Sequence, residues 1–252
     1  MSSSVKKAFA IIRYVADHQG ELTLSELGRK LEMNKTTMFR YLETLESLNL
    51  LEKRNGSWFL GMELFSLGHQ VDMQSRIVER VHPLVYNCSS TVNETLSFAG
   101  LINGAALYLD KVESSRGLQM RARLGDTLPF HSTALGKAIL SSLPDYKRDE
   151  IIKHLSLAPL TLRTLTDKKR LLQQIEDVRK NGFSLEQEEM EPGLSCVGVP
   201  LYVERMNFYG AVSFSGSSSH LTRKRMMGLV RELQEVAGRI METLQMDDAS
   251  NR

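Results

Sequence analysis

The first 61 residues combine three short helical patterns with a hairpin pattern directly after them. The hairpin signal is the dipeptide Asn55-Gly56, which separates the segments 50–54 and 57–60. Asn-Gly is the strongest short hairpin signal, because both residues accept the backbone angles of a two-residue turn. Three short helices followed by a hairpin predict a winged helix-turn-helix.

The first two helices are predicted from apolar residues at helical spacing and from signals at their ends. Residues 5–17 carry an apolar face, and Gly20 ends this helix. The second helix is expected over residues 24–31. Thr23 and Glu26 have the spacing of a capping box, in which each side chain bonds the other residue's backbone N–H.

The third helix is expected over residues 36–48, with Asn34 as its N-cap. Its apolar stripe consists of Met38, Leu42, Leu45 and Leu48. In a helix-turn-helix, the recognition helix enters the major groove and presents its N-terminal residues to base edges. Arginine pairs with guanine, and threonine donates, accepts or touches a thymine methyl group. The residues predicted to read DNA in this way are Lys35, Thr36, Thr37, Arg40 and Tyr41.

The hairpin tip adds three candidate DNA contacts. These are Lys53, Arg54 and Asn55, which are placed to contact phosphate or to reach into the minor groove. The formal net charge of the chain is only +2, and residues 1–61 hold nine Lys or Arg against seven Asp or Glu. Contact with DNA therefore depends on a local patch. The alternative is a small helical domain whose polar face is only solvated.

The pattern changes after the hairpin, and the chain divides into three predicted parts. Residues 1–61 form the winged helix-turn-helix, 62–76 a linker helix and 77–248 a second domain. The second domain mixes strands with helices, which predicts an α+β fold with an antiparallel sheet. The elements expected in it are helices at 77–92, 134–142, 145–155, 167–180 and 222–245, and strands at 95–102, 105–112, 118–124, 183–188, 196–204 and 208–215.

The cysteines and the apolar runs indicate the compartment. Cys88 and Cys196 cannot form a disulfide framework, and no CxxC spacing for a metal is present. No uncharged apolar stretch is long enough to span a bilayer. Arg13 interrupts the apolar run near the start, which argues against a signal peptide. We expect a cytoplasmic protein with no membrane partner, no metal and no cofactor.

Two segments of the second domain carry polar side chains suited to a small ligand. His131, Ser132 and Thr133 precede an apolar helix, and the N–H groups at a helix start attract an anion such as a carboxylate. Ser213 and Ser215 alternate with apolar residues on the last strand, so both hydroxyl groups lie on one face. The plainer interpretations are an ordinary helix N-cap and a partly exposed edge strand.

A third segment, residues 186–191, contains four carboxylates in six positions. Such a run is usually a solvated surface loop. Two further functions remain open for it and its neighbours. A metal-sensing regulator would use these carboxylates with His131 and Cys196, and an enzyme would use Cys196 as nucleophile with His131 as base. A lone cysteine of this kind is more often packed as a small hydrophobe.

Three segments, taken together and in order, resemble the IclR family of bacterial transcription regulators. They are NKTTMFRYL at residues 34–42, HSTALGKA at 131–138, and GFSLEQEE at 182–189 followed by CVGVPLY at 196–202. The resemblance implies a winged helix-turn-helix, a linker helix and a GAF-like effector domain, in dimers that often pair into tetramers. It implies double-stranded operator DNA and a small carboxylate effector as partners. Such effectors are commonly intermediates of sugar-acid, keto-acid or aromatic catabolism.

The family's effector-pocket positions carry over to residues of the second domain. Ala134 and Leu135 correspond to contacts at a helix start, and Leu118 and Met120 to an apolar wall. The remaining positions are Glu186, Leu194, Cys196, Ser213 and Ser215. This chain departs from the family pattern in three places: Leu135 is bulkier than usual, Glu186 replaces an aspartate, and Met38-Phe39 are larger than the common pair.

These observations and the resemblance lead to one mechanistic hypothesis. An effector carboxylate binds at the helix start near Ser132–Leu135, with hydrogen bonds from Ser213 and Ser215. The apolar walls are expected from Leu118, Met120 and Leu194. Binding favours one arrangement of two DNA-binding domains over another, through the linker helix. The chain is therefore predicted to be a transcription regulator of a catabolic operon, and not an enzyme.

Overall fold

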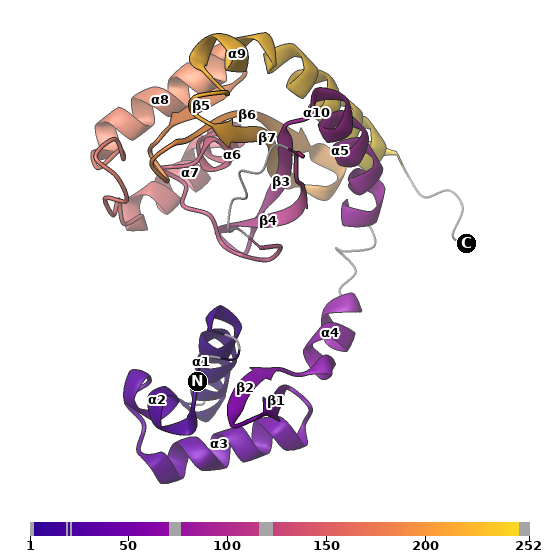
Figure 1. The fold of residues 1–252 in the computed structure, drawn as a ribbon. Helices are drawn as coiled ribbons and strands as arrows, with labels where there is room; N and C mark the ends of the chain where they lie inside the picture. Colours follow the sequence, from indigo (N-terminus) through magenta and orange to yellow (C-terminus); the bar gives the residue numbers. More distant parts are fainter. Residues whose placement is uncertain (1–2, 19, 21, 71–76, 116–122, 247–252) are drawn as a thin grey trace. The chain divides into compact units, whose positions relative to one another are not determined.

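The structure is a computed structural model that describes residues 3–18, 20, 22–70, 77–115 and 123–246 (Figure 1). The chain splits into two compact units, Met1–Gln74 and Ser75–Arg252. Each unit has a hydrophobic core of its own. The two units are therefore described separately.

The first unit begins with three helices packed around a small core. They are α1 (Ser3–Asp17), α2 (Leu24–Lys30) and α3 (Lys35–Ser47). The core consists of Ile11, Val15, Leu22, Leu27, Met38, Leu42, Leu45, Leu51 and Trp58. Leu48, which was predicted to continue the apolar stripe of α3, lies just beyond the end of the helix and is 55% exposed. That part of the prediction is wrong, because the helix ends before its next turn can face the core.

Both predicted helix caps are present. The Thr23 side chain accepts from the Glu26 backbone N–H, and the Glu26 carboxylate accepts from the Thr23 backbone N–H at 2.8 Å. Asn34 accepts from the Thr37 N–H at 2.8 Å. These bonds satisfy N–H groups that have no partner within the helix, so they define where α2 and α3 begin.

A two-stranded hairpin follows α3. It pairs β1 (Leu51–Arg54) with β2 (Ser57–Leu60) in antiparallel register. Asn55 and Gly56 connect the strands with φ of 50° and 85°. Two consecutive positive φ values are what the tight hairpin turn requires, and Asn and Gly reach them at low cost. The structure thus confirms the winged helix-turn-helix.

The helix after the hairpin is shorter in the described part of the chain than the predicted 62–76. It is α4 (Met62–His69), and residues 71–76 lie outside the described residues. Gly61 precedes α4, and its backbone lies very close to the backbone of Asn49. A Cβ atom at Gly61 would lie only 2.0 Å from the Asn49 carbonyl oxygen. The absence of a side chain at Gly61 allows the chain to pass directly over the end of the preceding segment.

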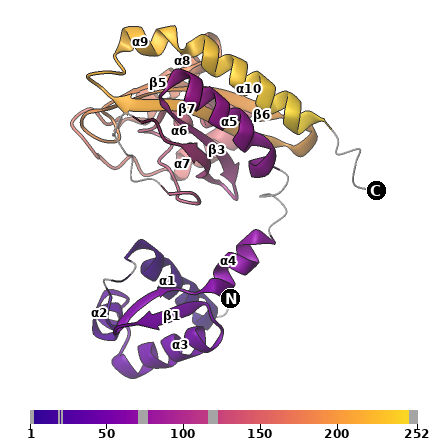
Figure 2. The ribbon, with the colours of Figure 1, turned by 45° about the vertical axis from the view of Figure 1, so that its right-hand side comes forward.

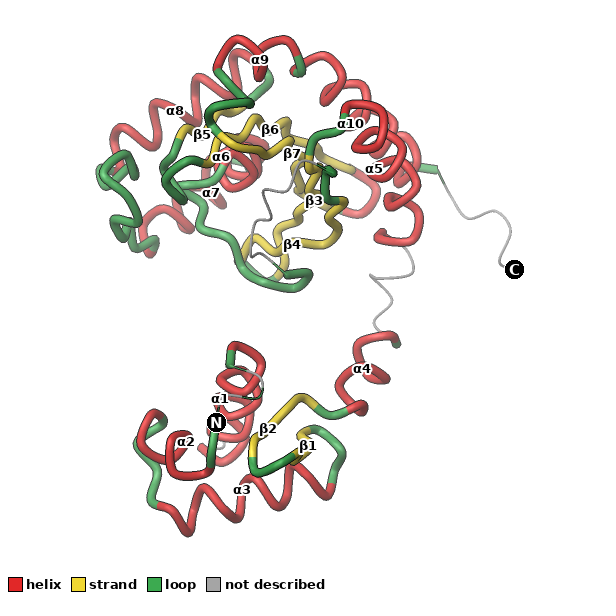
Figure 3. The backbone as a smooth tube through the Cα atoms, viewed as in Figure 1, coloured by secondary structure: helices red, strands yellow, loops and turns green. Residues whose placement is uncertain are grey.

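The second unit is built on a five-stranded antiparallel sheet in the order β4-β3-β7-β6-β5, drawn as yellow strands in Figure 3. The strands are β3 (Thr95–Ile102), β4 (Ala105–Val112), β5 (Ser184–Gln187), β6 (Leu194–Val203) and β7 (Phe208–Ser217). The predicted α+β fold with an antiparallel sheet is confirmed. β7 lies at the centre of the sheet, so the interpretation of this segment as an edge strand is wrong.

Helices cover both faces of this sheet, as Figure 2 shows. They are α5 (Glu79–Val92), α6 (Ala134–Ser142), α7 (Asp145–His154), α8 (Lys168–Asn181), α9 (Arg223–Gly228) and α10 (Val230–Gln245). On one face, α6 packs against β6 and β7 and is backed by α8, while α10 and α5 pack together and against the sheet. Strand alternation directs Phe98, Val212 and Phe214 to the face opposite that of Ser213 and Ser215.

Two predicted elements of this unit differ from the structure. The final helix, expected without interruption over 222–245, is divided at Leu229 into α9 and α10. Gly228 ends α9, and glycine is a poor helix former, which apolar periodicity alone does not register. Of the strand expected at 118–124, residues 118–122 lie outside the described residues. Arg123 and Leu124 belong to a loop and turn, not to a strand.

No helix within residues 3–18, 22–70, 77–115 or 123–246 combines the length and apolar character that a membrane crossing requires.

Candidate functional site

The first candidate site is the exposed face of α3 in the first unit. Lys35, Thr36 and Arg40 are exposed, whereas Thr37 and Tyr41 are half-buried. The buried residues Met38, Leu42 and Leu45 attach the opposite face of α3 to the core. The helix therefore presents a cationic and hydroxyl-bearing surface whose geometry is fixed from behind, as a recognition helix requires.

Phe39 was missed as a candidate contact in the sequence. It lies beside Arg40 on α3 and is 53% exposed, although its neighbour Met38 is fully buried. An exposed phenylalanine is costly to hydrate, and its ring can contact the methyl group of thymine in the major groove. The helical spacing of the sequence already indicated this exposure, because Phe39 does not lie on the apolar face defined by Met38 and Leu42.

The hairpin tip holds the other predicted DNA contacts, and all three side chains are exposed. Arg54 is bound to Glu52 of the same strand through two hydrogen bonds of 2.6 and 2.8 Å. The bond to Arg54 holds the pKa of the Glu52 carboxyl below its usual value. The Lys53 ammonium lies 5.7 Å from the Trp58 ring centre. Asn55, at the turn itself, is exposed.

The second candidate site is a polar area on the sheet face under the start of α6. The register of β5, β6, β7 and β3 places Glu186, Cys196 and Ser215 in one row. The adjacent row contains Ser184, Gly198, Ser213 and Ser97. A Cβ atom at Gly198 would lie 3.0 Å from the carbonyl oxygen of Ala134, so this glycine allows α6 to start directly over the sheet.

A small cavity lies at this place, and we call it the sheet cavity. Its lining residues are Tyr108, Thr133, Ala134, Leu135, Glu186, Met190, Leu194, Cys196, Ser213 and Ser215. Seven of the ten effector positions proposed from the sequence are therefore brought together. Its volume is about 10 Å³, which is close to the space that one water molecule needs.

The other predicted effector positions lie elsewhere. Ser132 is buried beside the sheet cavity, and its hydroxyl donates to the Met190 sulfur at 3.6 Å. Leu118 and Met120 lie outside the described residues. Tyr108, Thr133 and Met190 line the sheet cavity but were missed in the sequence. The alternation of β4 indicated Tyr108, because Ala106, Tyr108 and Asp110 share its buried face.

Several buried polar atoms around the sheet cavity have no hydrogen-bond partner among the described residues. They include the hydroxyl oxygens of Ser97 and Ser215 and Oε2 of Glu186. Buried polar groups in folded proteins are nearly always paired, so an unpaired group indicates a ligand, a water or a functional role. These three atoms occupy one sheet face, which makes it a candidate surface for a polar ligand.

Glu186 is the most perturbed acid of this area. Its side chain is fully buried, and its Oε1 accepts from the backbone N–H groups of Glu189 at 2.6 Å and Met190 at 3.2 Å. Burial raises the pKa of Glu186 to about 7, against the opposite effects of the Cys196 thiol and the two N–H bonds. Near neutral pH the carboxyl group is therefore partly protonated and can donate a hydrogen bond.

Cys196 is packed beside Glu186, and burial raises the pKa of its thiol well above the usual value. The thiolate is the nucleophilic form, so this environment opposes nucleophilic chemistry. His131, the base considered for an enzyme, does not line the sheet cavity, and its Nε2 lies 3.1 Å from the Ala158 carbonyl oxygen. The geometry does not bring the two residues together as a catalytic pair.

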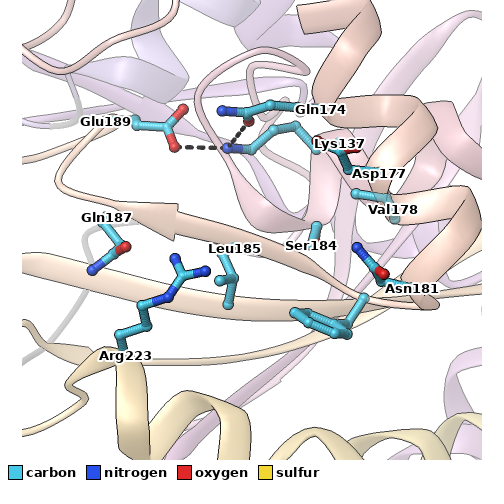
Figure 4. Close-up of a pocket in the computed structure, with 11 residues that line it drawn as sticks. Lys137, Gln174, Asp177, Val178, Asn181, Ser184, Leu185, Gln187, Glu189 and Arg223 are labelled. Carbon is cyan, nitrogen blue, oxygen red and sulfur yellow. Dashed lines mark hydrogen bonds and ion pairs between the residues drawn. The ribbon is translucent and has the colours of Figure 1, made fainter.

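The acidic segment at 186–191 is only in part the solvated loop that the sequence suggested, because Glu191 is exposed and Glu188 is half-buried. Glu186 and Glu189 are buried. Glu189 forms an ion pair of 2.7 Å with the buried Lys137 of α6, which Figure 4 shows. The hydroxyl groups of Thr161 and Thr164 hold the carbonyl oxygens of Glu188 and Glu189. Burial of charged groups requires such pairing.

No cluster of three or more His, Cys, Asp or Glu suited to a metal ion occurs among the described residues. The carboxylates at 186–191, His131 and Cys196 were the metal ligands considered from the sequence. Glu186 is instead bound to backbone N–H groups and Glu189 to Lys137. In each carboxylate these partners occupy Oε1, one of the two oxygens that a metal could use.

Two serines of the sheet face provide a matched test of this arrangement. Ser215→Ala is expected to leave the free energy of unfolding unchanged or to raise it, because its buried hydroxyl has no partner to lose. Ser184→Ala is expected to lower it by about 1–3 kcal/mol, because the Ser184 hydroxyl donates to the Ala134 carbonyl oxygen. Urea unfolding followed by circular dichroism measures both. An equal loss in the two variants would contradict the assignment of Ser215 as unpaired.

The comparisons with known proteins match both units. Residues 4–55 match the IclR helix-turn-helix domain, and residues 69–242 match the bacterial transcriptional regulator IclR C-terminal domain. The chain is 30% identical over 202 residues to the HTH-type transcriptional regulator KdgR of Dickeya chrysanthemi, covering 79% of this chain and 66% of that protein. It is 27% identical over 240 residues to the protein of the same name in Escherichia coli K12, covering 94% and 91%.

The architecture agrees with these matches. The crystal structure of Thermotoga maritima IclR superimposes with a TM-score of 0.74 at 27% sequence identity, covering 96% of this chain and 99% of that one. The family matches together cover the helix-turn-helix, the whole five-stranded sheet and its helices except the last residues of α10. The chain therefore belongs to the IclR family of bacterial transcriptional regulators.

Proposed function

We propose that this protein binds operator DNA through α3 and the hairpin tip, and that a small organic acid bound in the sheet cavity controls this binding. Membership of the IclR family indicates that the protein is a transcriptional regulator. The exposed Lys35, Thr36 and Arg40 supply the chemistry for bases and phosphates. We place the protein in the cytoplasm, where operator DNA is found.

One observation carries the proposal for the sheet cavity. The buried oxygens of Ser97, Ser215 and Glu186 lie on one sheet face without partners among the described residues. A ligand that supplies hydrogen-bonding atoms would satisfy them. No comparable set of unpaired buried atoms lies in the described part of the first unit, where Trp58 Nε1 is alone.

A carboxylate is the ligand group that fits this surface best. The first N–H groups of a helix have no intrahelical partner and carry partial positive charge, and α6 starts at the sheet cavity with Ala134 and Leu135. Ser213 and Ser215 offer hydroxyl donors, and protonated Glu186 offers a further one. Leu135 and Leu194 provide apolar walls. A sugar acid, a keto acid or an aromatic acid has the required combination of carboxylate and carbon skeleton.

The small size of the sheet cavity implies that binding moves side chains. A space of about 10 Å³ accommodates roughly one water molecule and not an organic acid. Met190 is the adaptable part of the lining, because its unbranched side chain has three rotatable bonds. Its backbone N–H is bound to Glu186, so displacement of Met190 affects the whole loop at 188–193. Ligand binding and a change of conformation are thereby linked.

The regulator is proposed to act as a homodimer or as a tetramer of paired dimers. Two recognition helices related by symmetry match half-sites about 34–36 Å apart. The effector alters this DNA binding only through its different affinities for the two arrangements of the DNA-binding domains. A nearly complete switch requires a difference of about 5.5 kcal/mol. The buried, protonated thiol of Cys196 supports regulation rather than enzymatic turnover as the function.

The test is a DNA-binding titration with the purified full chain and fragments upstream of its own gene and of neighbouring genes. Each fragment is measured alone and with sugar acids, keto acids and aromatic acids, at one salt concentration, because non-specific affinity depends strongly on salt. We expect specific binding to one fragment and a change of its affinity by at least one acid. Binding of every fragment at the non-specific level, with and without each acid, would refute the proposal.

A further inference from the structure

A second cavity lies at the outer edge of β5, and we call it the β5-edge cavity. Figure 4 shows its lining, which comes from α6, α8, the β5 segment and α9. Its volume is about 280 Å³, and it shares no lining residue with the sheet cavity. The residues are Lys137, Gln174, Asp177, Val178, Asn181, Phe183, Ser184, Leu185, Gln187, Glu189 and Arg223.

One end of the β5-edge cavity is formed by a buried charge pair. Lys137 is only 1% exposed, and its ammonium donates to Oε1 of Glu189 at 2.7 Å and to Oε1 of Gln174 at 3.0 Å. An ammonium has three hydrogens, and these two bonds use two of them. Oε2 of Glu189 is buried and has no partner among the described residues. A donor and an acceptor therefore lie side by side at this end.

The opposite wall carries polar side chains that have no partners within the described part of the chain. Arg223 of α9, Gln187 of β5 and Asn181 at the end of α8 make no side-chain hydrogen bond or ion pair there. Figure 4 shows the Arg223 guanidinium beside Gln187 and Leu185, with Asn181 on the far side. Phe183 adds an aromatic surface to this polar set.

The charges and hydrogen-bonding groups of this lining restrict the ligand. Two cations, Lys137 and Arg223, are balanced by two carboxylates, Asp177 and Glu189. A multiply charged anion such as phosphate would meet repulsion from the carboxylates as well as attraction. Amides, carboxylate oxygens and N–H donors placed together suit hydroxyl groups, each of which donates and accepts. An aromatic face suits the C–H side of a ring.

We propose that the β5-edge cavity is a second ligand site, for a polyhydroxylated compound of monosaccharide size that carries at most one negative charge. Such a compound uses Lys137, Glu189 and Asn181 for its hydroxyl groups. Arg223 meets the single carboxylate when one is present.

The two cavities are joined by one short segment of chain. Glu189 binds Lys137 through its side chain, and its backbone N–H donates to Glu186 of the sheet cavity at 2.6 Å. Met190, the next residue, lines the sheet cavity. A ligand that alters Glu189 therefore alters the effector's affinity, and the effector alters that ligand's affinity by the same factor. This coupling rests on the proposed function, whereas the second site does not.

The test is isothermal titration calorimetry of the full chain, without DNA, against D-glucose, D-galactose, D-gluconate, D-glucuronate and inorganic phosphate. We expect at least one sugar or sugar acid to bind. Arg223→Ala and Asn181→Ala are each expected to weaken that binding about tenfold or more, the effect of removing a hydrogen bond to a polar ligand. The control Lys224→Ala, an exposed residue of the same helix, is expected to leave it unchanged. The double variant Ser213→Ala, Ser215→Ala is expected to retain it, since it alters only the sheet cavity.

Three results would overturn the assignment. The first is the absence of binding by every sugar and sugar acid at millimolar concentrations. The second is binding that the serine double variant abolishes while Arg223→Ala and Asn181→Ala retain it, which would place the ligand in the sheet cavity. The third is tighter binding of phosphate than of every polyhydroxylated compound. None of these results depends on whether the protein binds an operator.

Discussion

Replacing Arg40 with alanine is expected to lower the affinity for operator DNA by about 5- to 150-fold, a loss of about 1–3 kcal/mol. Arg40 is exposed on α3, whose opposite face is fixed in the core by Met38 and Leu42. A guanidinium in this place pairs with guanine through two parallel hydrogen bonds. Removal of the side chain leaves the packing of α3 intact, so the melting temperature is expected to remain unchanged.

The measurement for Arg40 is a pair of titrations, with the operator and with unrelated DNA of equal length. The control is Arg13→Ala, which removes an exposed arginine of α1 and the same formal charge. We expect Arg40→Ala to reduce the ratio of specific to non-specific affinity and Arg13→Ala to preserve it. Unchanged operator affinity in Arg40→Ala would show that Arg40 does not contact a base.

Replacing Glu186 with glutamine is expected to remove a marked dependence of stability on pH. The pKa of Glu186 is raised to about 7 in the folded protein, from 4.5, because the carboxyl group is buried. Between these values the folded state binds a proton that the unfolded state lacks. The resulting stabilisation is fully present below pH 4.5 and is lost as pH rises through about 7. The loss amounts to about 3 kcal/mol.

The measurement for Glu186 is urea unfolding at several values of pH between 4.5 and 8, followed by circular dichroism. Trp58, the single tryptophan, reports on the first unit separately by its fluorescence. In the wild type, the free energy of unfolding of the second unit is expected to fall as pH rises over this range. In Glu186→Gln, most of this fall is expected to be absent. Glu235→Gln, at an exposed carboxylate of α10, serves as the control and is expected to follow the wild type. If the free energy of unfolding depended on pH in the same way in Glu186→Gln and in the wild type, the raised pKa of Glu186 would be contradicted.

The first unit was predictable because its signals are local. The capping box of Thr23 and Glu26, the N-cap Asn34 and the turn Asn55-Gly56 each act within four residues. Local hydrogen bonds and backbone preferences are therefore sufficient to place these elements. The end of α3 was harder to predict from the sequence, because the exposure of Leu48 depends on the path of the chain after the helix.

The sheet cavity was predictable in part, for a different reason. Alternation along β7 placed Ser213 and Ser215 on one face, and the resemblance supplied Glu186, Leu194 and Cys196. The central place of β7 depends on pairing with β3 and β6, which lie far from each other in sequence. Burial of Glu189 likewise depends on Lys137, 52 residues away. Long-range contacts of this kind are not encoded in any short pattern.

The same limitation explains the acidic segment at 186–191. Four carboxylates in six residues favour a solvated loop when they are considered alone. In the folded chain, backbone N–H groups hold Glu186 and the Lys137 ammonium holds Glu189. A buried carboxylate is tolerated when such partners are present. The segment thus became part of two cavities, which composition alone did not indicate.

The most direct test of the account is to measure operator affinity against effector concentration, in the wild type and in Ser213→Ala, Ser215→Ala. The effector is the acid that shifts the wild-type affinity. We predict equal operator affinity for both proteins without the acid, since the two serines lie in the second unit. We also predict that the double variant responds only at much higher concentrations of the acid. A response at the same concentration in both proteins would contradict control of DNA binding through the sheet cavity.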